Sequence, residues 1–255
     1  MNDLRKLEAY CGEDRVFVDN RIRIRGKSNM TLLPDYYMVE VYNMSETDKA
    51  LLSSRKELRV LTETMAVFIS GEVEDIYTTY EGANQVSVIS VTDGQSFWET
   101  KVSQTVGRGA LISTTIRHIL KNATMGSYLA KDDRFIRSQA FHGRLADCIS
   151  SLARGVHARA FISKDVLHVV EEGRSEVIVA VEEEDLVDEP HFADGVCIVK
   201  ATVKSWPVGM LHEFRGNRYR LVSQSIDADN YQGNWQTELM LVNEVYLDKD
   251  GMDGG

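Results

Sequence analysis

The spacing of apolar residues changes twice between positions 141 and 170, near the middle of the chain. Leu145, Ile149 and Leu152 recur at the i, i+4, i+7 spacing of one helical face. Gly155 follows this stripe at the position where a left-handed helix cap is common. The pattern therefore predicts a helix that ends at this glycine.

The rest of this stretch predicts a two-stranded ribbon. Its β-rich segments are Val156–Ile162 and Val166–Val170, joined by the turn-forming residues Ser163, Lys164 and Asp165. Helix and ribbon together make a small α+β unit. Strand-like sequence lies on both sides of it, so the unit divides a β-rich chain.

Alternation with a period of two predicts a strand near the N-terminus. Ile22 and Ile24 alternate with Arg21, Arg23 and Arg25, which places apolar side chains on one face and three guanidinium groups on the other. Such a charged face is either solvated or a docking surface. The sequence leaves both interpretations open.

The same patterns predict the remaining elements. Short strands separated by Gly and Asp-Gly turns are typical of a β-sandwich or barrel. These strands are expected at 37–42, 58–60, 65–74, 86–91, 176–181, 196–206, 218–226 and 235–242. Helices are expected over residues 2–11, from an N-cap at Ser45 through Leu52, and along the stripe of Ile112, Ile116 and Ile119.

We therefore predict a mainly β fold with an α+β insert. Two β-barrel or sandwich domains, residues 1–105 and 176–247, flank a helix-plus-ribbon insert at 106–175. Residues 248–255 are predicted to be a flexible tail.

Composition narrows the class of protein. The 255 residues are 43% hydrophobic and 27% charged, as in ordinary soluble globular proteins. No apolar segment approaches the ~20 residues of a membrane span, and the N-terminus lacks the apolar core of a signal peptide. Cys11, Cys148 and Cys197 form no close pair, which predicts reduced thiols. We expect the protein to be made and kept in a cytoplasm-like compartment.

The charge balance bears on nucleic-acid binding. A net charge of -10 argues against a protein that grips DNA, because binding phosphates needs clustered Lys and Arg. The acidic segment Glu182, Glu183, Glu184 and Asp185 is expected to be exposed, toward a lumen or an assembly seam, because unpaired carboxylates are rarely buried. An acidic surface repels a duplex.

Motifs for chemistry are weak. Gly107-Arg108-Gly109 precedes a predicted helix, but Ile112 stands where a third phosphate-binding glycine belongs. No histidine pairs with a cysteine at the spacing of a zinc motif, and the aspartates of 248–253 do not fit a calcium loop. The sequence predicts no enzyme, no cofactor and no metal site.

Three stretches carry a family resemblance. The first contains LLPDYYMVEVYNM and FISGEVEDIYTTYEG, the second is AFHGRLADCISSLARGVHARAFISKDVLHVV, and the third is WPVGMLHEFRGNRYRLVSQSIDADNYQGNWQTELMLV. In this order they resemble the tube-type β domain, the helix-plus-ribbon segment and the closing hairpins of the central hub proteins of bacteriophage baseplates. That family is related to the late control protein of contractile tails.

The resemblance implies a structural protein of the virion tail, made in the host cytoplasm. Each chain would have two tail-tube-like domains, and a homotrimeric ring would match the sixfold tail tube and seat a spike or tip protein on its far side. The implied partners are the tail tube or tube-initiator protein, the spike or tip protein and baseplate wedge proteins. DNA would only pass through, and no membrane is involved. Interface residues are expected at Arg21, Arg23, Arg25, Trp206, Tyr231 and Trp235.

Three alternatives remain open. One is another tube-fold baseplate protein, such as the tube initiator. A second is a non-viral cytoplasmic β-rich module that binds oligosaccharide or peptide in an aromatic groove around Trp206, Tyr231 and Trp235. A third is a hydrolase whose site would use His142, His157 and Cys148. The sequence argues against the hydrolase because these residues lie in a core-forming segment without nucleophile–base spacing.

Overall fold

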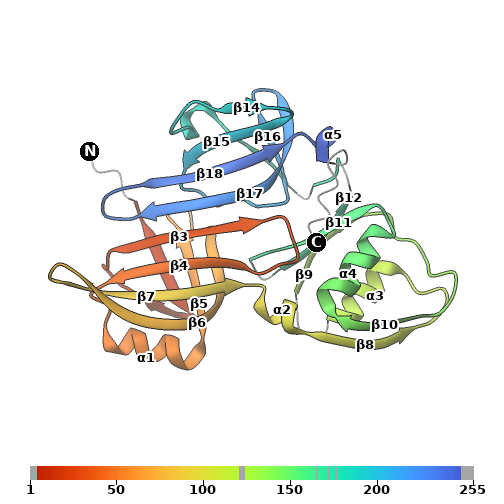
Figure 1. Ribbon diagram of the computed structural model, residues 1–255, viewed down its shortest axis with the longest axis horizontal. Coiled ribbons are helices and arrows are strands. Elements are labelled where there is room, and N and C mark those ends of the chain that lie inside the picture. The colour runs from red at the N-terminus through yellow and green to blue at the C-terminus, as the bar shows by residue number, and fades with distance from the viewer. Residues whose placement is uncertain (1–4, 121–123, 165, 172, 176, 248–255) are drawn as a thin grey trace.

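The β-rich part of the molecule and a smaller α+β unit lie side by side along its longest axis (Figure 1). The computed structural model describes residues 5–120, 124–164, 166–171, 173–175 and 177–247. The fold is mainly β with an α+β insert, which confirms the predicted fold class. The predicted tail, 248–255, lies outside the described residues.

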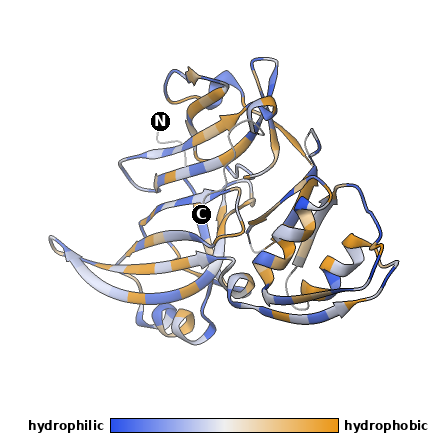
Figure 2. Cartoon of the chain, turned by 45° about the vertical axis from the view of Figure 1, so that its right-hand side comes forward, coloured by the Kyte–Doolittle hydropathy of each residue, from blue (hydrophilic) through white to orange (hydrophobic). Residues whose placement is uncertain are grey.

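Among the described residues, thirteen strands form one sheet. Its N-terminal half has the order β3-β4-β7-β6-β5-β1-β2 and surrounds one apolar core. Apolar and polar positions alternate along these strands (Figure 2), because successive side chains point to opposite faces. The strands are β1 (Leu7–Cys11), β2 (Asp14–Val16), β3 (Ile22–Asn29), β4 (Asp35–Tyr42), β5 (Glu57–Thr62), β6 (Val67–Glu81) and β7 (Asn84–Asp93).

The C-terminal half continues the same sheet around a second apolar core. Strand β17 pairs with β3 in antiparallel register, from Ser223 opposite Asn29 to Asp229 opposite Arg23. The two β halves are thus joined edge to edge. The elements of this half are β13 (Ile178–Ala180), η1 (Glu183–Asp185), β14 (His191–Ala193), β15 (Val196–Thr202), β16 (Leu211–Phe214), β17 (Asn217–Asp229), β18 (Trp235–Val242) and α5 (Glu244–Leu247).

The middle unit has a third core, built by two amphipathic helices. Ile116 and Ile149 are fully buried in it, as the helical stripes predict. Phe97 and Val102 also pack there, although they precede the predicted boundary at 105. The elements are α2 (Gln95–Glu99), β8 (Lys101–Val106), α3 (Ile112–Leu120), β9 (Thr124–Leu129), β10 (Gln139–Arg144), α4 (Leu145–Arg154), β11 (Ala158–Ser163) and β12 (Val166–Glu171).

Local capping confirms one predicted helix and corrects the end of another. Ser45 Oγ accepts the backbone N–H of Asp48 at 3.0 Å, and α1 (Glu46–Arg55) begins there. At the end of α4, Gly155 has a right-handed φ of -62°, so the predicted left-handed cap is wrong. His157 has the positive φ, 54°, where the chain turns into β11.

The predicted N-terminal helix is wrong. Residues 7–11 form β1, in which Leu7, Ala9 and Cys11 are buried in alternation. A stripe of only two leucines did not distinguish the helical period from the strand period. The long strand predicted at 196–206 is also shorter, because β15 ends at Thr202.

Lys164, in the turn of the middle unit's ribbon, forms hydrogen bonds with both β halves. Its backbone N–H donates to Asp93 Oδ2 at 2.6 Å, at the end of β7. Its Nζ donates to the carbonyl oxygen of Val67 and to Ser205 Oγ, each at 2.5 Å. Burial lowers the pKa of this lysine to about 8. The ribbon turn of the middle unit is therefore anchored to both β halves.

Candidate assembly surface

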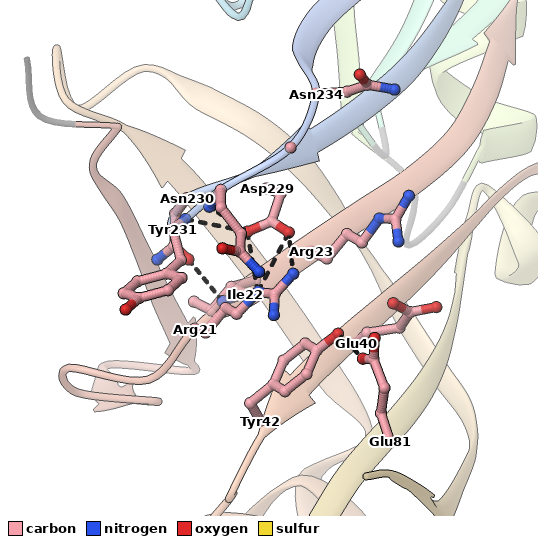
Figure 3. Close-up of polar contacts among 12 residues, drawn as sticks. Arg21, Ile22, Arg23, Glu40, Tyr42, Glu81, Asp229, Asn230, Tyr231 and Asn234 are labelled. Atoms are coloured by element: carbon pink, nitrogen blue, oxygen red, sulfur yellow. Dashed lines mark hydrogen bonds and ion pairs between the residues drawn. The ribbon is translucent and has the colours of Figure 1, made fainter. Parts of the chain in front are cut away.

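The pairing of β3 with β17 places basic and acidic side chains opposite each other. Ile22 and Ile24 point into the core, so the arginines of β3 lie on the outer face. Part of this group is shown in Figure 3. We name it the seam cluster and define it as Arg21, Arg23, Arg25, Glu40, Asp227 and Asp229.

Arg21 and Asp229 form the best-defined pair of the seam cluster. Arg21 Nη2 lies 2.5 Å from Asp229 Oδ2, and Nε lies 3.2 Å from both carboxylate oxygens. The aspartate side chain is 3% exposed. Burial raises its pKa, but the Arg21 hydrogen bonds and the N–H groups of Tyr231 and Gln232 outweigh this effect and leave the pKa lowered. The carboxylate is thus held ionised inside the seam.

Two tyrosines enclose the Arg21 guanidinium. Its carbon atom lies 4.2 Å from the ring centroid of Tyr42 and 5.8 Å from that of Tyr231. The Tyr42 hydroxyl donates to a carboxylate oxygen of Glu81, on β6. Arg21, which directly precedes β3, is therefore connected to β4, β6 and β17 through one network of polar and cation–π contacts (Figure 3).

The other two arginines are paired more loosely. Arg25 Nη1 lies 3.4 Å from Glu40 Oε1, and its side chain is 44% exposed. Arg23 Nη2 lies 3.5 Å from Asp227 Oδ1. The three arginines meet acidic groups, but those groups belong to this chain. Arg25 is the most exposed of the three.

The sequence patterns did not predict where the two aspartates of the seam cluster lie. The strand predicted at 218–226 stops before Asp227, whereas β17 runs on to Asp229. The available signal was alternation, since Ile226 and Ala228 are buried while Asp227 and Asp229 point to the other face.

A polar groove of about 920 Å³ lies beside the seam. One wall is formed by β1 and the β2–β3 turn, and the other by residues 230–233. Asn230 Oδ1 accepts the backbone N–H of Ile22 at 2.7 Å, which fixes the second wall against β3. Tyr231 stands at the rim, 73% exposed. Arg5, Lys6 and other charged residues line it, so the surface of the groove is largely polar.

Comparison with solved structures finds tail proteins of similar fold. No protein-family model and no curated protein matches the sequence. A tail protein from Neisseria meningitidis MC58 matches with a TM-score of 0.67 at 9% identity, covering 94% of this chain and 97% of that chain. The 43 kDa tail protein of prophage MuSo2 from Shewanella oneidensis matches with a TM-score of 0.66 at 8% identity and the same coverage.

A third structure comes from a secretion machine. It is an Escherichia coli component of the type VI secretion system, described as structurally similar to the T4 bacteriophage tail proteins gp27 and gp5. It matches with a TM-score of 0.61 at 7% identity, covering 93% of this chain and 76% of that chain. This chain has the fold of phage tail proteins. At such identities the likeness concerns the fold alone.

The three aromatic residues predicted to lie at an interface differ in burial. Trp206 is 2% exposed and packs in the C-terminal core, with Nε1 donating to the carbonyl oxygen of Thr202 at 3.2 Å. The expectation that it lines a surface is therefore wrong, because the chain turns inward after β15. Trp235 is half-buried beneath Arg5, whose guanidinium lies 5.9 Å from its ring. Tyr231 is the exposed member of the three.

The four residues of the acidic segment also differ in burial. Glu182, Glu183 and Glu184 are exposed, as predicted. Asp185 is 5% exposed, so the prediction is wrong for this residue. Its carboxylate pairs with Lys204 and accepts the backbone N–H of Glu182 at 3.2 Å, which closes the turn of η1 and holds the side chain inward.

The residues considered for hydrolysis do not meet. Cys148 is buried on α4, and burial raises the pKa of its thiol, which disfavours the nucleophilic thiolate. His142 lies on β10 with Nδ1 3.1 Å from Ser103 Oγ, while His157 follows α4. In the described part of the chain, no three His, Cys, Asp or Glu side chains are grouped to hold a metal ion. None of its described helices is long and apolar enough to cross a membrane.

Proposed function

We propose that the chain is the structural hub of a phage tail baseplate, which joins the tail tube to the central spike or tip and lines the DNA conduit. The observation that carries this proposal is the extent of the fold match. It covers 94% of this chain and 97% of the Neisseria tail protein, so the shared architecture includes both β halves and the middle unit. The hub resemblance of the sequence supports the same assignment.

The architecture suits a ring. Each β half has its own core, and the β3–β17 pairing fixes one half beside the other. Three chains would supply six such halves, which reconciles a sixfold tube with a threefold spike. The proposed partners are other copies of the chain, the tail tube or tube-initiator protein, the spike or tip protein and baseplate wedge proteins. The role is non-enzymatic, and the site of action is the virion.

Localisation in particles tests this function. We expect an epitope tag on the chain to label tails at the end distal to the capsid, at the junction of tube and spike, in electron micrographs of purified particles. Interrupting the gene should leave particles without completed tails. A label distributed along the tube, or particles that lack the chain, would contradict the hub assignment. A label on the tube side of that junction only would favour the tube initiator.

The conduit role predicts weak DNA binding. A net charge of -10 and the exposed carboxylates of Glu182, Glu183 and Glu184 should repel phosphates. We expect the purified protein to leave a short duplex unretarded in a gel shift at roughly physiological salt, where non-specific binders have Kd values of about 10⁻⁴ to 10⁻⁶ M. Retention that weakens steeply with added salt would show the opposite.

A further inference from the structure

Buried polar side chains cross the inner face of the sheet where the two β halves join. Ser28 on β3 lies opposite Gln224 on β17, and Gln224 lies opposite Leu239 on β18. Thr237 stands two residues before Leu239 and shares its face, because alternate residues of a strand point the same way. Ser28, Gln224 and Thr237 are 4%, 4% and 0% exposed. Ile226, opposite Thr237, belongs to the N-terminal core and Leu239 to the C-terminal core, so the polar side chains lie where the two cores meet.

Each of these three side chains has a buried oxygen without a hydrogen-bond partner. The atoms are Ser28 Oγ, Gln224 Oε1 and Thr237 Oγ1, and nothing in the part of the chain that the structure describes bonds to them. An unpaired buried polar group is costly, and such groups in native proteins are nearly always paired with protein atoms or with ordered water. Three unpaired oxygens at neighbouring positions of one face therefore point to a shared ligand.

The chemistry of the three groups favours water as this ligand. The two hydroxyls can each donate a hydrogen bond, and the glutamine oxygen accepts one. A water molecule matches this set, since it can accept from Ser28 and Thr237 and donate to Gln224, and buried waters typically make about three such bonds. Diagonal neighbours such as Gln224 and Thr237 are about 7 Å apart at their Cα atoms, a gap that a long side chain and a water can span.

A cation is the competing ligand, because a carboxyl lies next along the same face. The register of β3 and β4, in which Lys27 lies opposite Tyr36, brings Ser28 across from Asp35. Burial raises the pKa of Asp35, which disfavours the ionised carboxylate that a cation would need. The other three oxygens are neutral. A neutral ligand therefore fits this set of groups better.

We propose that ordered water is bound between the two β halves and bridges Ser28, Gln224 and Thr237. We name this place the seam water site. The water connects β3 of the N-terminal half with β17 and β18 of the C-terminal half from the inner face, whereas Arg21 and Asp229 connect the halves at the outer face. Water-mediated hydrogen bonds are enthalpically almost as favourable as direct ones, so the site contributes to holding the halves in register.

The sign of a near-isosteric substitution tests the seam water site. Thr237→Val and Ser28→Ala each remove one hydroxyl from the full-length chain. We expect each to raise the unfolding equilibrium constant about 5-fold in urea denaturation, because a hydrogen bond to the bridging water is lost. In a dry site, valine would replace a hydroxyl that had no partner, and Thr237→Val would stabilise the protein. That outcome overturns the proposal.

A double-mutant cycle tests whether the two hydroxyls share one ligand. The effect of Ser28→Ala combined with Thr237→Val should differ at least about 2-fold from the product of the single effects, because both groups act on the same water. Thr115→Val is the matched control, since the Thr115 hydroxyl donates to the carbonyl oxygen of Leu111 at 2.9 Å in the middle unit. Its effect should multiply with that of Thr237→Val. Multiplicative effects for the Ser28 and Thr237 pair as well would contradict a shared ligand.

Two further measurements identify the ligand without depending on the stability of a variant. A high-resolution crystal structure of the wild type should show a density peak within about 3.2 Å of all three oxygens. Urea denaturation in sodium, potassium and tetramethylammonium chloride at equal ionic strength should give the same midpoint. Absence of the peak overturns the proposal. So does stabilisation by sodium or potassium that Thr237→Val abolishes, since the ligand would then be a cation.

Discussion

Replacing Arg21 with methionine is expected to lower the free energy of unfolding by about 3 kcal/mol. The Asp229 carboxylate is 3% exposed, and Arg21 is its cationic partner across the seam. Methionine keeps much of the packing volume between Tyr42 and Tyr231 but leaves a buried charge without its counter-ion. The two N–H groups that also reach Asp229 are neutral donors and compensate only in part.

Urea denaturation, followed by circular dichroism, measures this effect. Arg25→Met is the matched control, because it removes a nearby guanidinium on β3, and the Arg25 side chain is 44% exposed. This substitution should change stability by less than about 1 kcal/mol. Adding Asp229→Asn to Arg21→Met should recover part of the loss, since the buried charge is then gone. Equal effects of the two arginine substitutions would show that the seam pair is not a stabilising contact.

The same pair limits what a charge reversal at the seam can reveal. Changing Arg21 to Glu would set a second carboxylate against Asp229 and disturb the fold. Reversal at Arg25 alone changes an exposed side chain, so it is the cleaner probe of a partner surface on β3.

Local patterns predicted local structure well in this chain. The Ile22 and Ile24 alternation identified β3, and the Leu145, Ile149 and Leu152 stripe identified α4. Both patterns report which face of one element is buried, and a core of any shape satisfies them. The middle unit was predicted for the same reason, because its helices and ribbon lie close together in sequence.

The seam could not be predicted in this way. Strands β3 and β17 are separated by about two hundred residues, and no local period states which strands pair. The pairing decides that Arg21 faces Asp229 instead of solvent. Residue type also did not decide whether Trp206 is buried, since tryptophan occurs both in cores and at surfaces. Only the chain path after β15 places it in the core.

A second large effect is expected at Asp35, where replacement by asparagine should stabilise the protein at neutral and higher pH. The side chain is 5% exposed at the start of β4. Burial raises its pKa from 3.8 to about 7 despite hydrogen bonds from Asn29, whose backbone N–H donates at 3.0 Å. Asparagine retains an oxygen that accepts this bond and removes the buried charge. The gain should be on the order of 4 kcal/mol at about pH 8, since each pKa unit corresponds to about 1.4 kcal/mol.

The pH dependence gives the prediction its sign. Between pH 3.8 and about 7 the folded protein keeps the Asp35 proton and the unfolded chain has lost it, so the native state binds more protons and its stability falls as pH rises. The stabilising contribution of the protonated carboxyl is complete below pH 3.8 and lost as pH passes 7. Urea titrations at about pH 4 and about pH 8 should therefore show Asp35→Asn close to the wild type at the lower pH and more stable at the higher one. Asp75→Asn, which changes an exposed carboxyl on β6, should be neutral at both pH values. A gain at Asp35 of equal size at both pH values would mean that the substitution acts through packing and not through ionisation.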